Sequence, residues 1–208
     1  SLYDRLIERG AVMGDSFGLE NALWFAKNQK DAHEDPTFKR SRSHDYVHEE
    51  VKAVRNSVGA TEIANFAKHE FTGTGARKFL DYIMAGRIPR PGRIILSPML
   101  TPKGKLYGDL TVACLSEEKF MIFGSGAAQE MHRRWFEKFL PKNDVNYKNR
   151  SDDFHGIAIS GPNSRKLLSK ICRDDLSDKM FKFRDTRETF VAGVPAILNR
   201  ISFSGELG

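Results

Sequence analysis

One segment of the sequence occurs twice, and this repetition constrains the fold more than any other feature. Glu70–Ile83 and Ala158–Ile171 share one pattern: an expected strand ending at Gly73 or Gly161, a small residue three positions later, then Arg-Lys and an apolar helical stripe. A strand, a glycine turn and a helix that recur in this way predict a duplicated α+β unit. Two copies are too few for a solenoid, so we expect pseudo-twofold symmetry.

The stretch between the two copies predicts a β-hairpin. Pro102 and Gly104 indicate a turn, residues 105–115 alternate between apolar and polar side chains, and residues 119–123 return as an apolar strand. Successive side chains of a strand point to opposite faces. One face should carry Leu106, Leu110, Val112 and Cys114, with a gap at Gly108, and the other Lys105, Tyr107, Asp109 and Thr111.

Asp109 does not suit the interior of this strand. Asp is depleted in strands, and a residue that breaks a local rule is a candidate for function. The alternative is a solvated carboxylate on an edge strand, and periodicity alone does not separate the two.

The remaining pattern predicts a mainly antiparallel α+β fold with helices packed on its sheets. Residues 3–11 indicate a short helix, residues 21–25 a buried apolar patch, and residues 27–43 a surface loop. Ser43 is the expected N-cap of a helix over residues 45–58. Its buried side should carry Tyr46, Val47, Val51, Val54 and Val58. Further helices are expected over 74–84 and 127–140, and strands at 63–72, 145–147, 189–194 and 195–203.

Composition excludes some classes of function. No apolar run of the 208 residues is long enough to span a bilayer, so we expect no membrane partner. The net charge of +6 comes from scattered basic residues, which does not favour nucleic acid and leaves an anionic small ligand open. Cys114 and Cys172 form neither a disulfide scaffold nor a zinc motif, which indicates a reducing compartment. His44 and His48 share a helical face, but no third ligand is evident and we predict no metal.

A glycine turn at residues 123–126 invites a dinucleotide-binding interpretation, which we reject. Gln129 stands where the third glycine of the fingerprint belongs, and the preceding strand pairs most simply in a hairpin rather than a parallel sheet. The turn's amides either contact a ligand or cap the following helix.

Four segments in order resemble the folate-binding domain of aminomethyltransferase, the glycine-cleavage T-protein. They read VGATEIANFAK at 58–68, GKLYGDLTV at 104–112, ISGPNSR at 159–165 and RISFSGELG at 200–208. Residues 10–14 and 21–25 resemble the segment that joins a flavin domain to this module in dimethylglycine and sarcosine dehydrogenases. The turn at 123–126 is also similar to the dimethylglycine dehydrogenase branch. The resemblance implies a fragment that lacks the flavin domain and the carboxy-terminal domain, with a lead-in at 1–45 and a folate-binding domain at 46–208.

The resemblance also implies a reaction. Tetrahydrofolate would accept the one-carbon unit of an iminium or formaldehyde formed by demethylation of dimethylglycine or sarcosine, giving 5,10-methylenetetrahydrofolate. Asp109 would relay the proton lost by the folate nitrogen, and Glu206 would accept hydrogen bonds from the pterin. Phe66 would pack on the ligand or lie in the core. The other implied contacts are Thr111, Tyr107, Gly124 and Ser125.

Three positions differ from the T-protein pattern: Gly108-Asp109 replaces an Asp-Asp pair, Phe66 a Met, and Phe203 a Tyr. The implied partners are tetrahydrofolate, with or without a polyglutamate tail, and a small substrate derived from a methylated amine. FAD would bind only in the absent amino-terminal domain. The expected compartment is a bacterial cytoplasm or the mitochondrial matrix. The rivals are a stand-alone aminomethyltransferase, a folate-dependent demethylase and a non-catalytic folate-binding relative, and the oligomeric state stays open.

Overall fold

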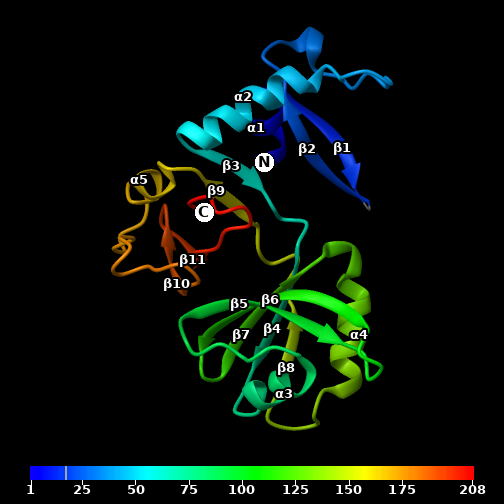
Figure 1. Ribbon diagram of the computed structural model, residues 1–208, viewed down its shortest axis with the longest axis vertical. Helices are drawn as coiled ribbons and strands as arrows, with labels where there is room; N and C mark the ends of the chain where they lie inside the picture. The colour runs from blue at the N-terminus through cyan, green and yellow to red at the C-terminus, as the bar shows by residue number, and fades with distance from the viewer. Residues whose placement is uncertain (17) are drawn as a thin grey trace.

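The computed structural model describes residues 1–16 and 18–208, with a five-stranded sheet at one end of the molecule (Figure 1). The sheet is antiparallel throughout, in the order β5-β6-β7-β4-β8. Its strands are β4 (Ala67–Thr72), β5 (Arg93–Leu100), β6 (Leu106–Ser116), β7 (Lys119–Gly124) and β8 (Asn146–Asn149). The predicted hairpin of residues 105–123 is therefore confirmed as β6 and β7.

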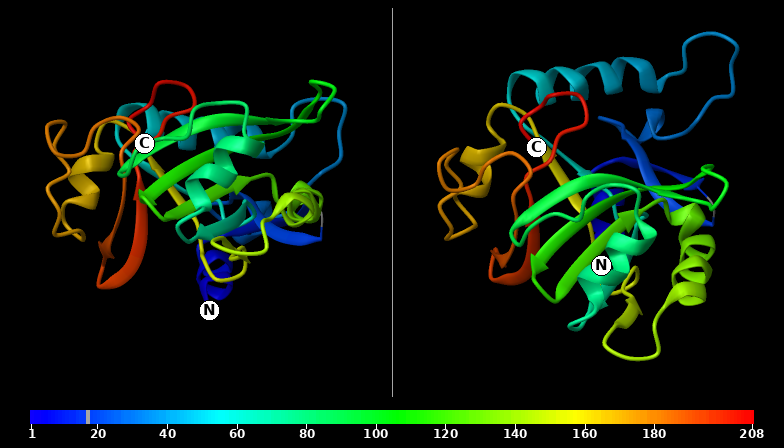
Figure 2. Two further views of the ribbon diagram at one scale, coloured as in Figure 1. Left: turned by 90° about the horizontal axis from the view of Figure 1, so that it is seen from below. Right: turned by 60° about the horizontal axis from the view of Figure 1, so that its bottom comes forward.

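Helices α3 (Ala76–Ile83) and α4 (Gln129–Phe139) cover the same face of this sheet (Figure 2). Alternate residues of β6 and the apolar stripes of both helices bury themselves in one core, because burial of apolar surface is the main favourable term in folding. Its fully buried members include Phe71, Leu80, Met99, Leu110, Val112, Phe120, Ile122 and Phe136.

The two copies of the repeated segment adopt the same local conformation. Gly73 and Gly161 have φ angles of +117° and +127°, and each carbonyl accepts a 3.0 Å hydrogen bond from the amide three residues later. A β-carbon would lie 2.3 Å from the Asp144 carbonyl oxygen at the first glycine and 2.5 Å from that of Ser57 at the second. Both turns thus require glycine, for backbone conformation and for space.

The strand of the second copy lies in a two-stranded sheet, whereas that of the first lies in the five-stranded sheet. The second copy comprises β9 (Ile157–Ser160), which pairs with β3 (Gly59–Glu62), and α5 (Ser164–Leu168). The hairpin of β10 (Thr186–Val191) and β11 (Val194–Asn199) follows. The predicted strand 195–203 therefore ends four residues early, because Glu206 draws residues 202–204 into a turn.

The amino-terminal region consists of α1 (Leu2–Glu8), the hairpin of β1 (Ala11–Ser16) and β2 (Leu19–Phe25), the short η1 (Gln29–Asp31) and α2 (Ser43–Asn56). The apolar patch predicted at residues 21–25 is one strand of this hairpin, which the sequence analysis did not expect. Trp24 is buried, whereas Leu23 is 53% exposed. Only part of the patch is therefore core.

Helix α2 differs from its prediction in two ways. It starts at Ser43, whose hydroxyl contacts that of Ser41 at 2.6 Å instead of capping the helix. None of its residues is buried, and Val47 and Val51 are 38% and 47% exposed. The apolar periodicity predicted the right helix, but its predicted apolar face is only half-buried at Tyr46, Val54 and Val58.

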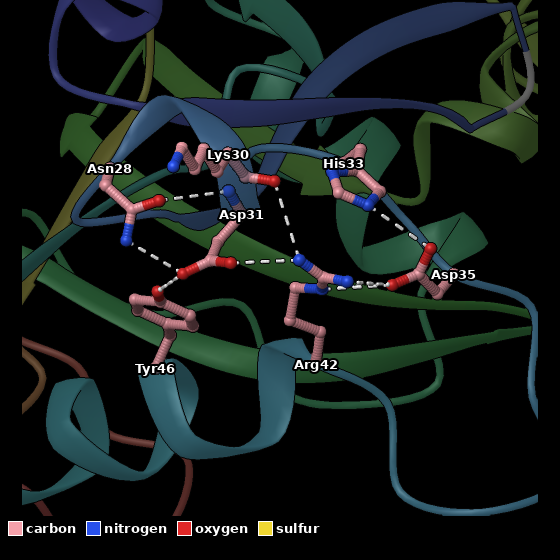
Figure 3. A network of polar contacts seen from close by, with 7 residues as sticks. All are labelled: Asn28, Lys30, Asp31, His33, Asp35, Arg42 and Tyr46. Atoms are coloured by element: carbon pink, nitrogen blue, oxygen red, sulfur yellow. Dashed lines mark hydrogen bonds and ion pairs between the residues drawn. The ribbon is translucent and has the colours of Figure 1, made fainter.

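A polar network joins α2 to the loop before it (Figure 3). Asp31 accepts hydrogen bonds from Tyr46 at 2.5 Å, Asn28 at 2.8 Å and Arg42 at 2.9 Å, and Arg42 also pairs with Asp35 at 2.7 Å. The bond from Tyr46, followed by that from Asn28, lowers the pKa of Asp31. The Tyr46 ring also contacts Trp24, with centroids 5.1 Å apart. The predicted surface loop is thereby anchored at both ends.

Candidate functional site

The face of the five-stranded sheet opposite the helices carries the candidate residues. The register places Leu96, Thr111, Phe123 and Lys68 in one row across β5, β6, β7 and β4. Asp109 lies two residues before Thr111 and opposite Pro98, so it shares this face. We call the part of this face formed by Leu96, Pro98, Asp109, Thr111 and Phe123 the open face.

Part of this side of the sheet is covered. Ile94, Ala113 and Met121 are buried at one end, against Phe123, Phe154 and Ile197, and Lys68 of β4 is also buried. At the open face Leu96 remains 66% exposed, next to the exposed Asp109. An apolar side chain beside a carboxylate suits a ligand with both a ring and polar N–H groups.

The carboxylate of Asp109 is free to bind. It makes no hydrogen bond or ion pair within residues 1–16 and 18–208, and its neighbours Gly108 and Leu110 are buried on the helix side. The prediction that Asp109 and Thr111 face away from Leu110, Val112 and Cys114 is confirmed, but Leu106, predicted on the same face as Leu110, pairs with Leu100 and is 63% exposed.

The prediction that Tyr107 shares the face of Asp109 is wrong. The pairing shifts between Met99, opposite Gly108, and Leu100, opposite Leu106, so that Tyr107 is the extra residue of a β-bulge. Its ring turns to the helix side and lies 4.3 Å from Trp135 of α4, centroid to centroid. Periodicity cannot reveal such a bulge, because it assumes an unbroken alternation.

Phe66 stands on a loop that is fixed by a buried lysine. The ammonium of Lys68 donates to the carbonyl oxygens of Ala64 and Phe66, both at 2.7 Å. Lys68 is 3% exposed, and burial lowers its pKa. The Phe66 side chain itself is 46% exposed, so it is not a core aromatic. Sequence reasoning missed Lys68, because it lies in the polar run Lys68-His69-Glu70 of β4 and does not stand out from its neighbours as Asp109 does on β6.

The glycine turn after β7 lies against this loop. A β-carbon at Gly126 would be 1.9 Å from the Asn65 carbonyl oxygen, and one at Gly124 would be 2.6 Å from Leu110. Gly124 is therefore required for packing behind the sheet, while Ser125 is exposed beside the loop that carries Phe66.

Glu206 is occupied by its own loop. Its carboxylate accepts hydrogen bonds from the amides of Phe203 (2.9 Å) and Ser204 (2.8 Å) and from the hydroxyls of Ser202 (3.1 Å) and Ser204 (2.8 Å). These bonds, that of the Phe203 amide first, lower its pKa to about 2. The loop is held to the second glycine turn, because the Gly161 amide donates to the Leu207 carbonyl oxygen at 2.9 Å. No contact in the described part of the chain joins Glu206 to Asp109.

The chain has recognisable relatives among known proteins. The family model "GCVT N-terminal domain" matches residues 2–208. The chain belongs to this family. It is 38% identical over 210 residues to mitochondrial dimethylglycine dehydrogenase of Homo sapiens, covering 100% of the chain and 24% of that protein. It is 30% identical to aminomethyltransferase of Thermosipho melanesiensis, covering 100% of the chain and 52% of the relative.

The fold also matches solved structures. Aminomethyltransferase T of the glycine cleavage system from Bartonella henselae superposes with a TM-score of 0.74 at 18% identity, over 99% of this chain and 50% of that one. The heterotetrameric sarcosine oxidase of Corynebacterium sp. U-96 gives a TM-score of 0.57 at 17% identity, over 79% of this chain and 82% of that one. The predicted α+β fold and family are thus confirmed. The chain spans about a quarter of the dimethylglycine dehydrogenase and half of the aminomethyltransferases.

Within the described residues, no helix is long and apolar enough to cross a membrane.

Proposed function

We propose that the open face binds the pterin end of tetrahydrofolate, and that the module transfers a one-carbon unit to it. The observation that carries the proposal is Asp109: a carboxylate without a partner in the described structure, next to the exposed Leu96 and on the uncovered end of the sheet. Membership of the GCVT family supports it, because this family includes folate-dependent aminomethyltransferases.

The residues of the open face fit a reduced folate. Leu96 and the half-buried Phe123 offer apolar surface to a ring, and Asp109 accepts hydrogen bonds without first giving up a partner. Thr111 lies between them in the register and provides a hydroxyl. Phe66 and Ser125 would border the ligand from the adjoining loops. Glu206 would contact it only after exchanging bonds within its own loop.

Tetrahydrofolate supplies the nitrogen nucleophile, and the chain supplies a proton acceptor. The carbon donor is an iminium or formaldehyde released from dimethylglycine or sarcosine, and the product is 5,10-methylenetetrahydrofolate. Two folate nitrogens form C–N bonds to the one carbon and each loses a proton, and the two protons leave with the amine of the iminium or with the oxygen of formaldehyde as water. The Asp109 carboxylate accepts the proton of one nitrogen, passes it to the leaving group and stabilises the developing positive charge. Phe154 and Ile197 cover the other end of this side of the sheet, which supports a ligand position at the Asp109 end.

The test replaces Asp109 by Asn in the natural protein that contains this chain. Removing one proton acceptor should lower the yield of 5,10-methylenetetrahydrofolate by about 10²- to 10⁴-fold. Oxidation of the amine should be unchanged, and formaldehyde should appear in place of the folate product. Asp81→Asn is the matched control, because Asp81 is exposed on α3, which covers the opposite face. An unchanged folate yield in Asp109→Asn would remove Asp109 from the mechanism.

A second candidate is a stand-alone aminomethyltransferase, which the 30% identity to that enzyme over the whole chain supports. The two candidates differ in the donor of the carbon unit. A flavin spectrum of the natural protein and a yield that depends on dimethylglycine or sarcosine would support the first; a colourless protein that lacks this dependence would support the second. The mammalian relatives are mitochondrial, so for a eukaryotic source we propose the mitochondrial matrix, and for a bacterial source the cytoplasm.

A further inference from the structure

Two histidines lie buried between the sheet and helix α4, on the side opposite Asp109. His69 is on β4 and His132 is on α4, and they are 0% and 3% exposed. Their ring centroids are 6.3 Å apart at an interplanar angle of 73°. Neither takes part in the proposed reaction, since both lie on the helix side of the sheet. Sequence analysis did not single them out.

Each ring uses one nitrogen and leaves the other without a hydrogen bond in the described structure. His132 Nε2 lies 3.3 Å from the carbonyl oxygen of Tyr107, and His69 Nδ1 lies 2.8 Å from the hydroxyl of Tyr147. His132 Nδ1 and His69 Nε2 are buried and have no partner. A buried polar atom without a hydrogen bond is rare in a native protein and calls for a physical explanation.

The contacts set the protons on these rings. A carbonyl oxygen only accepts, so His132 Nε2 must carry the proton and Nδ1 must be an acceptor. If the Tyr147 hydroxyl donates to His69 Nδ1, the remaining nitrogen of His69 carries a proton and is a donor. The two orphaned nitrogens are then complementary. One water molecule can bridge two such groups over about 5.5 Å, twice a normal hydrogen-bond length.

We propose that a buried water joins His69 Nε2 to His132 Nδ1, and that the resulting relay from Tyr147 to the Tyr107 carbonyl makes His132 a positioning residue for Asp109. The end of the relay falls on the bulge of β6, two residues before Asp109. A bulge has an unpaired residue and is a weak point of a strand. The hydrogen bond from His132 holds the Tyr107 carbonyl of the bulge in place. The imidazole ring also fills the space beside Gly108 and Gly124, because a β-carbon at these glycines would lie 2.8 Å from Nε2 and 3.3 Å from Nδ1 of His132.

The relay is tested on the ¹⁵N-histidine-labelled chain by long-range ¹H–¹⁵N spectra of the imidazole rings at pH 7. His69→Gln and His132→Gln assign the signals of the two buried rings, because the other four histidines are exposed. We expect both buried rings as neutral Nε2–H tautomers, and a cross-peak from His69 Hε2 to a water proton. A His69 ring protonated on Nδ1, or no water contact at that proton, would overturn the relay.

The positioning role rests on the proposed function and is tested in the natural protein that contains the chain. His132→Gln keeps an amide N–H at the place of Nε2, whereas His132→Phe fills the space without a donor. We expect His132→Phe to lower kcat for methylenetetrahydrofolate formation about tenfold or more, with KM changed less, and His132→Gln to restore most of it. Equal activity of the two variants would contradict a positioning role. The tautomer spectra need no folate, so they test the water relay independently of the proposed function.

Discussion

The burial of His69 makes the stability of the chain depend on pH. Burial is the main reason why the pKa of His69 falls from 6.5 to about 4, and the neighbouring His132 lowers it further. In the unfolded chain the ring takes up a proton near pH 6.5, whereas in the folded chain it stays neutral. The contribution of this residue is therefore fully present above pH 6.5 and is lost as the pH falls from 6.5 through about 4.

The two pKa values give the size of the effect. A difference of two to three pKa units corresponds to about 3 kcal/mol in total, of which about 2 kcal/mol is lost between pH 7 and pH 5. The assay is urea unfolding at pH 7, 6 and 5 for the wild type and for His69→Gln, which cannot titrate. His69→Gln should be less stable at pH 7 but lose about 2 kcal/mol less on going to pH 5. His48→Gln, at an exposed position of α2, is the matched control and should follow the wild type. Parallel pH profiles of wild type and His69→Gln would refute the reasoning.

Three further predictions concern residues that shape the site. Gly73→Ala should lower the unfolding free energy by about 2–4 kcal/mol, because a β-carbon there meets the Asp144 carbonyl at 2.3 Å; Gly193→Ala, with a positive φ but no atom within 4 Å, should lose only about 1 kcal/mol. Equal losses in urea titrations would contradict this. Lys68→Met should destabilise by about 1–3 kcal/mol and speed amide exchange in residues 63–66, whereas Lys148→Met, at an exposed position of β8, should do neither. Glu206→Ala should speed amide exchange at Phe203 and Ser204, and unchanged exchange there would show that the carboxylate does not hold the loop.

The local elements of the fold could be predicted from the sequence because they follow short-range rules. The glycine turns at Gly73 and Gly161, the hairpin of β6 and β7, and helices α3 and α4 all show in the pattern of apolar residues and glycines. The predictions that failed concern features that depend on tertiary contacts. Val47 and Val51 stay exposed on the apolar face of helix α2. Glu206 ends the strand that residues 195–203 favour, because hydrogen bonds to its side chain replace those of a β-ladder.

The candidate site was predictable where one residue broke a local rule. Asp109 did so on β6, whereas Lys68 did not stand out within the polar run Lys68-His69-Glu70 of β4. Tyr107 could not be placed, because a one-residue bulge reverses the face of every side chain on one side of it. His69 and His132 were equally hidden, since a histidine among charged neighbours gives no sign of its burial or of whether its nitrogens have partners in the folded chain.

Hydrogen exchange of the natural protein with and without saturating tetrahydrofolate tests the central claim most directly. If the open face binds the pterin, protection should appear in peptides that cover residues 94–98 and 109–112, and Asp109→Asn should weaken it while Asp81→Asn should not. Protection confined to other parts of the protein, or equal protection in both variants, would contradict the assignment of this sheet face as the folate site.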